Sequence, residues 1–143
     1  GARVGYAIGS ADVINAFNKV RNHFGMCRIS QEGALAALSD TDWLSHVTDA
    51  VAEARNRISA IARQNGLTAL PSATNFVAID CGRDGDFARA VLAALVAEGI
   101  FVRMPFVAPQ DRCIRVSCGT CEQMDAFESA LPTALTTAHR KLG

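Results

Sequence analysis

The sequence predicts an α+β fold, with helices covering one face of a small antiparallel or mixed sheet of three to four short strands. Three observations lead to this expectation. One long amphipathic helical pattern occupies the middle of the chain, and the second half alternates strand, helix, strand, strand, helix. The last two strands are joined by a short loop, which fits an antiparallel pair. The 143 residues, half of them hydrophobic, suffice for one core of ordinary domain size.

The N-terminal residues predict one strand and two helices. Residues 3–8 (RVGYAI) are rich in β-formers and end at Gly9, so we predict a strand there. Ser10 is a suitable N-cap for a helix with its apolar positions on one face, namely Val13, Ile14, Phe17 and Val20. Residues 23–30 read as a connection, and residues 31–38 as a short Ala/Leu-rich helix.

The most strongly periodic segment follows residues 39–42 (SDTD), which offer several N-cap side chains. Its apolar stripe comprises Leu44, Val47, Val51, Ala54, Ile58 and Ile61. Gly66 stands where a left-handed cap is favoured. We therefore predict a helix of about 20 or more residues that ends at this glycine.

Residues 75–80 (NFVAID) predict a buried strand. Asp84 or Asp86 then caps a helix that ends just before Gly99. Thr120 and Gln123 form a capping box for a final helix.

The final helix contains Pro132, which should kink or weaken it. Between the two helices of the second half, residues 100–104 and 113–118 predict two strands around a loop with two prolines.

Charge and cysteine content limit the classes of function. Fourteen basic and fourteen acidic side chains cancel without forming a block, so we expect no nucleic-acid or membrane partner, but a small molecule or another protein. No apolar run reaches the roughly 20 residues of a membrane span, and no export signal is visible. Five irregularly spaced cysteines argue for a reducing compartment, and we expect a cytoplasmic protein.

Two arginines, Arg103 and Arg115, lie in the two predicted strands of residues 100–104 and 113–118. A guanidinium is costly to bury unless it meets a carboxylate or phosphate, so the pair suggests an anion site. If the strands pair, both side chains can point to the same face. The alternative is that both are edge-strand arginines whose charged ends reach solvent.

Cys118 and Cys121 form a CxxC motif at a strand-to-helix junction, where the helix N-terminus favours a low thiol pKa and redox chemistry. For zinc, the motif supplies two ligands, and no second half of a recognised pattern accompanies it. We therefore predict no metal site and favour a simple cysteine-containing turn.

The segments GARVGYAIG, TNFVAID, VRMPF and IRVSCGT, with the long helix between the first two, resemble the C-terminal part of class I/II aminotransferases. These are fold-type-I pyridoxal-phosphate enzymes, and the histidinol-phosphate aminotransferases look most similar. The resemblance implies that residues 1–38 are a remnant of the large cofactor-binding domain. Residues 39–143 would be the small C-terminal domain, including the long linking helix.

The resemblance also implies roles for three arginines. Arg3 matches the family residue that binds the phosphate of pyridoxal 5'-phosphate. Arg115 matches the one that binds the substrate α-carboxylate, and Arg103 the one that faces the distal end of the substrate. The family's Schiff-base lysine falls before the position of Arg3, so no residue here is assigned a catalytic role. We therefore expect these 143 residues alone to be inactive.

By the same resemblance, the intact enzyme would be a homodimer that moves an amino group between an amino acid or amino-alcohol phosphate and a 2-oxo acid. Three alternatives stay open. One is a decarboxylase of an amino-acid phosphate, similar to threonine-phosphate decarboxylase. Another is a thiol redox or metal-binding module using Cys118 and Cys121. The third is a non-catalytic protein-binding domain.

Overall fold

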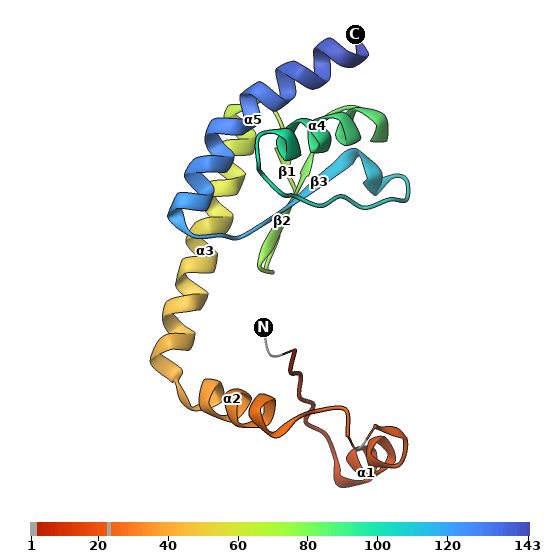
Figure 1. Ribbon diagram of the computed structural model, residues 1–143, viewed down its shortest axis with the longest axis vertical. Helices are drawn as coiled ribbons and strands as arrows, with labels where there is room; N and C mark the ends of the chain where they lie inside the picture. Colours follow the sequence, from red (N-terminus) through yellow and green to blue (C-terminus); the bar gives the residue numbers. More distant parts are fainter. Residues whose placement is uncertain (1–2, 23) are drawn as a thin grey trace. The chain divides into compact units, whose positions relative to one another are not determined.

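The computed structural model describes residues 3–22 and 24–143 (Figure 1). Within this part, the elements in chain order are α1 (Ala11–Val20), α2 (Arg28–Ser39), α3 (Thr41–Gln64), β1 (Thr68–Ala69), β2 (Phe76–Asp80), α4 (Gly85–Ala97), the 3-10 turn η1 (Gln110–Arg112), β3 (Cys113–Ser117) and α5 (Cys121–Leu142). The contacts divide the chain into two compact units, Gly1–His46 and Val47–Gly143.

The N-terminal unit contains α1, α2 and the start of α3. The predicted helix after Ser10 is present as α1, whereas α2 begins at Arg28, earlier than predicted. The predicted strand over residues 3–8 is wrong, because this described segment forms no strand. A strand needs the ladder hydrogen bonds of a neighbour, and the unit's described residues provide no neighbouring strand.

The long predicted helix is confirmed as α3, which runs for 24 residues. The chain leaves it at Gly66, whose φ of +73° is the left-handed conformation that glycine adopts without a steric penalty. Its C-terminal half contributes Ala54, Ile58 and Ile61 to the buried core.

The sheet of the C-terminal unit has the order β1-β2-β3, with both pairs antiparallel. Successive side chains of a strand point to opposite faces. On one face, the buried pairs are Val77 with Val116 and Ile79 with Ile114. The opposite face carries the pair of Ala78 with Arg115.

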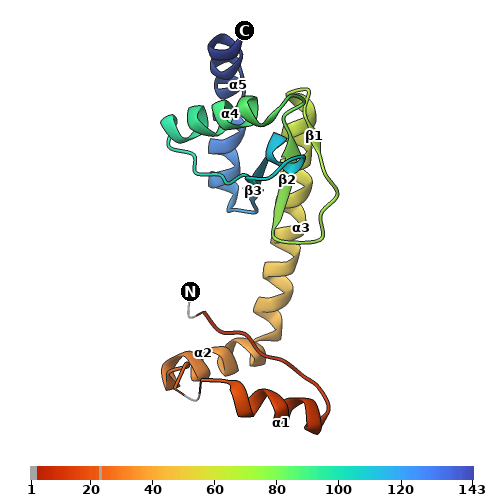
Figure 2. The same cartoon turned by 90° about the vertical axis from the view of Figure 1, so that its right-hand side faces the viewer.

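Helices cover the buried face of this sheet, which confirms the α+β prediction. Figure 2 shows α4 crossing α5, and the two helices are in contact. The largest buried side chains that they and α3 bring to the common core are Phe87, Leu95, Phe127, Leu131, Ile58 and Ile61. The face that carries Arg115 therefore lies on the side of the sheet away from this core.

The caps of the two later helices agree with the predictions. The Asp84 side chain accepts a hydrogen bond from the backbone nitrogen of Phe87, and Thr120 and Gln123 form the reciprocal capping box of α5. Pro132, which was expected to kink or weaken the last helix, lies inside α5, and the helix continues past it to Leu142. Tertiary packing of the helix's apolar face outweighs the loss of one backbone hydrogen bond.

The predicted strand over residues 100–104 is reduced to a single bridge between Arg103 and Arg115, and the short β1 was not predicted. In an antiparallel ladder, the next hydrogen-bonded pair after Arg103 and Arg115 would involve residue 105 on one strand. Pro105 has no backbone N–H and cannot extend the ladder. Among the described residues, no helix combines the length and apolar character needed to cross a bilayer.

Candidate anion-binding site

Arg115 occupies the middle of β3, between Ile114 and Val116. Both neighbours are buried in the core, so the alternation of the strand directs Arg115 to the opposite face. The arginine is half-buried there, and its direct cross-strand neighbour on β2 is the small Ala78. On this face of the sheet, β3 therefore presents the guanidinium of Arg115 beside the small side chain of Ala78.

Arg103 lies directly opposite Arg115 in the isolated bridge. The backbone nitrogen of Arg103 donates to the Arg115 carbonyl at 3.1 Å, and the backbone nitrogen of Arg115 donates to the Arg103 carbonyl at 2.6 Å. Residues that exchange both hydrogen bonds have side chains on the same face of the sheet. The tertiary fold therefore brings together two predicted site residues that are twelve positions apart.

Two like charges directly opposite each other destabilise a sheet unless something compensates them. Among the described residues, no carboxylate forms an ion pair with Arg103 or Arg115; the described ion pairs involve Arg57, Arg89 and Arg112 instead. The uncompensated pair is suited to an anionic ligand, because guanidinium forks match carboxylate and phosphate oxygens.

Phe76 contacts the Arg115 guanidinium, whose carbon lies 4.7 Å from the centre of the phenyl ring. This residue was not singled out from the sequence. The alternation of Phe76, Val77, Ala78 and Ile79 carried a signal, because it places an aromatic residue on the face opposite the two core residues. The identity of its neighbour on that face required the strand register.

Both arginines border a cavity of about 510 Å³. The other walls are largely apolar and include Leu92, Phe101, Pro105 and Phe106. An apolar cavity with a few charged groups at its border is a common arrangement for a small-molecule site, since the charged groups fix the orientation of the ligand.

Arg3 lies in the N-terminal unit, whereas Arg103 and Arg115 lie in the C-terminal unit. Its side chain is exposed, and its φ of 56° is in the left-handed region that non-glycine residues seldom adopt. No ion-pair partner for it occurs in the described part of the chain. Its free guanidinium is chemically suited to a phosphate group.

The cysteines of the CxxC motif differ in burial. Cys121 is exposed, whereas Cys118 is partly buried, and this desolvation raises the pKa of the Cys118 thiol. A raised pKa is the opposite of the low-pKa thiolate typical of redox cysteines. Within residues 3–22 and 24–143, no group of three or more His, Cys, Asp and Glu side chains is arranged to hold a metal ion.

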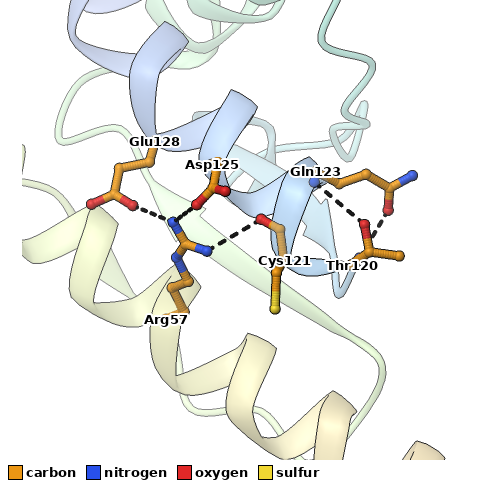
Figure 3. Close-up of polar contacts among 6 residues, drawn as sticks. All are labelled: Arg57, Thr120, Cys121, Gln123, Asp125 and Glu128. Carbon is orange, nitrogen blue, oxygen red and sulfur yellow. Dashed lines mark hydrogen bonds and ion pairs between the residues drawn. The ribbon is translucent and has the colours of Figure 1, made fainter.

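Arg57 of α3 contacts the first turns of α5, the helix that follows β3 (Figure 3). Its guanidinium contacts Asp125 at 2.5 Å and Glu128 at 2.6 Å, and it donates to the carbonyl of Cys121 at 3.2 Å. The hydrogen bonds with Glu128 and Asp125 hold the pKa of Arg57 above its usual value. These contacts hold the first turns of α5 against α3, a few residues after Arg115 in the sequence.

Comparison with known proteins identifies a family over most of the chain. The family described as "Aminotransferase class I and II" matches residues 1–131. The chain is 36% identical over 135 residues to histidinol-phosphate aminotransferase 2 of Methylococcus capsulatus, covering 94% of this chain and 36% of that protein. It is also 36% identical over 140 residues to histidinol-phosphate aminotransferase of Gluconacetobacter diazotrophicus, covering 95% and 38%.

A solved structure shows the same relationship. The crystal structure of histidinol-phosphate aminotransferase from Sinorhizobium meliloti in complex with pyridoxal-5'-phosphate has a TM-score of 0.84 and 50% sequence identity, covering 92% of this chain and 35% of that one. The chain thus spans little more than a third of the length of these relatives. Because the family match extends over most of the sequence, the chain belongs to the class I and II aminotransferases.

Proposed function

We propose that the whole protein to which these residues belong is a pyridoxal-phosphate-dependent aminotransferase of the histidinol-phosphate type. It transfers an amino group between an amino acid or amino-alcohol phosphate and a 2-oxo acid. The observation that carries the proposal is the uncompensated pair of Arg103 and Arg115 on one face of the sheet. The matches to histidinol-phosphate aminotransferases support the same assignment.

In this proposal, Arg115 binds the substrate α-carboxylate and Arg103 binds the distal group, a phosphate in an amino-alcohol phosphate. Arg115 is the half-buried member of the pair, and its side chain rests against Phe76. These contacts suit a planar, two-pronged interaction with a carboxylate. Arg103 is exposed, and no aromatic contact of its side chain is found among the described residues. This suits a substrate group whose position varies from one substrate to another.

Pyridoxal 5'-phosphate fits the chemistry of Arg3, whose exposed guanidinium has no ion-pair partner in the described residues. We propose that Arg3 binds the cofactor phosphate. When bound, the cofactor supplies the electron sink for the chemical step. The residues described here bind anions and thereby orient the reactants, which lowers the entropic cost of reaction.

We further propose a homodimer located in the cytoplasm, with small molecules as its other partners. The five cysteines are all free, which suits a reducing compartment. Sedimentation of the whole protein with and without the cofactor tests the dimer, and a single monomeric species in both conditions would contradict it.

The test of the proposed function is a transaminase assay of the whole protein with added pyridoxal 5'-phosphate, an L-amino-acid donor and a 2-oxo acid. Histidinol phosphate replaces the donor in a parallel reaction. Formation of the new oxo product is expected. Release of carbon dioxide without an amino-group transfer would instead identify a decarboxylase.

The variant Arg115→Gln tests the assigned residue in the same assay. Loss of a charged hydrogen bond of about 1.5–3 kcal/mol predicts a KM about 10- to 150-fold higher for the amino-acid donor. Arg63→Gln is the matched control, because Arg63 is an exposed arginine in the last turn of α3. Equal kinetics of the wild type and Arg115→Gln would remove Arg115 from the site.

A further inference from the structure

The contact between Phe76 and Arg115 follows from the register of the sheet. Arg115 of β3 is paired with Ala78 of β2, and Phe76 lies on β2 two residues before Ala78. Phe76 is therefore the diagonal neighbour of Arg115 on the face away from the core, within reach of a long side chain. The guanidinium carbon accordingly lies 4.7 Å from the ring centre.

This contact supports the guanidinium without occupying its hydrogen-bond donors. An aromatic ring attracts a cation through its π face, while the five N–H donors of arginine lie in the guanidinium plane. A carboxylate partner within the chain would instead compete with an incoming anion for those donors. Among the described residues, no such carboxylate pairs with Arg115.

The backbone of Phe76 is itself fixed. Its carbonyl accepts hydrogen bonds from the Ser72 hydroxyl at 2.5 Å and the Thr74 hydroxyl at 3.2 Å. The guanidinium of Arg55 on α3 donates to the Thr74 carbonyl at 3.0 Å. The ring therefore projects from the first residue of β2, and hydrogen bonds hold the turn that precedes it.

We propose that Phe76 is a positioning residue for anion binding by Arg115. It holds the guanidinium against its ring and leaves the donor edge free for a carboxylate. This inference rests on the proposed function, because it assigns to Phe76 the orientation of the group that binds the substrate carboxylate. Phe76 itself contacts Arg115 and is assigned no step in the reaction.

The experiment compares Phe76→Leu, Phe76→Tyr, Arg115→Gln and the wild type in the whole protein loaded with cofactor. Leucine keeps apolar bulk without a π face, whereas tyrosine keeps the ring. Arg83→Gln is the matched control, because it removes the other described arginine–aromatic contact, 5.0 Å from the Phe87 ring centre and outside the site. One readout is the KM and kcat for the amino-acid donor. The other is the stabilisation of the protein by succinate, an unreactive dicarboxylate, in thermal melts without turnover.

Phe76→Leu is expected to raise the KM and the dissociation constant of succinate by about 2- to 10-fold, the factor of a cation–π contact, with kcat retained. Phe76→Tyr and Arg83→Gln are expected to match the wild type. Equal values for Phe76→Leu and the wild type, beside weakened binding in Arg115→Gln, would overturn the role of Phe76 and leave the proposed function intact. Equal losses in the Leu and Tyr variants would also overturn it, as a structural effect. Unchanged binding in Arg115→Gln would contradict the proposed use of Arg115 and the inference together.

Discussion

Replacing Arg103 by glutamine should stabilise the ligand-free protein, although it removes a proposed binding residue. Arg103 and Arg115 are directly opposite in a hydrogen-bonded bridge, and no described carboxylate pairs with either. In a water-like dielectric, two unit charges repel each other by about 1 kcal/mol at about 4 Å and by less at larger separations. Like charges directly opposite in a sheet have effects of the same order, about 0.2–1 kcal/mol. Arg103→Gln should therefore raise the free energy of unfolding by a few tenths of a kcal/mol.

The assay is urea unfolding of the whole protein, free of substrate, at two ionic strengths. The gain should be present at about 10 mM salt and lost at about 1 M, where the Debye length falls from about 30 Å to about 3 Å. Arg63→Gln is the control with the opposite sign. Its cation lies in the last turn of α3, where the helix dipole favours positive charge, so its removal should destabilise the protein.

Succinate should reverse the order of stability of the wild type and Arg103→Gln. The wild type, with both arginines, should gain more stability from the ligand than Arg103→Gln does. The reasoning is refuted if Arg103→Gln destabilises the ligand-free protein at low salt. It is also refuted if a gain persists unchanged at high salt, because the repulsion would then not be its cause.

Two further predictions concern the fold around the site. A Cβ at Gly85 would meet the end of the Asp111 side chain, with the Cγ 2.8 Å away, so Gly85→Ala should destabilise the protein by about 0.5–1.5 kcal/mol as that side chain turns aside. In an Asp111→Ala background, Gly85→Ala should instead stabilise the protein by about 0.4–1 kcal/mol, because alanine restricts the unfolded chain. Urea unfolding of the wild type, both single variants and the double variant tests this, and an equal effect of Gly85→Ala in the two backgrounds would contradict it. Burial raises the pKa of the Cys81 thiol from its ordinary value of 9.0 to about 12, so the folded state retains the proton longer. The protonated Cys81 thiol contributes fully to the free energy of unfolding below pH 9, and this contribution should fall by about 1.4 kcal/mol per pH unit between pH 9 and 12. The free energy of unfolding of Cys81→Ala should lack this fall, so parallel pH profiles of the variant and the wild type would contradict the prediction.

The local features of the fold were predictable because they depend on a few neighbouring residues. The capping box of Thr120 and Gln123, the cap at Asp84 and the left-handed Gly66 each follow from side-chain chemistry or backbone freedom within one turn. The alternation of residues 76–80 likewise predicted a strand with one buried face.

The errors occurred where hydrogen-bond partners lie elsewhere in the chain. Residues 3–8 have the composition of a strand, but no described strand pairs with them. Residues 100–104 have a similar composition, and only Arg103 forms a bridge, because Pro105 cannot donate to a ladder. Strand propensity measures how well side chains suit a sheet and does not supply the neighbouring strand.

The candidate site combines both kinds of information. The sequence by itself determined that two arginines, Arg103 and Arg115, stand in apolar surroundings near the ends of a short connection, and its resemblance to aminotransferases suggested their roles. Only the tertiary structure decided that they are directly opposite, that no described carboxylate neutralises them, and that Phe76 supports one of them. Those facts depend on strand register, which is set by the packing of Val77 and Ile114 into a shared core and not by any local pattern.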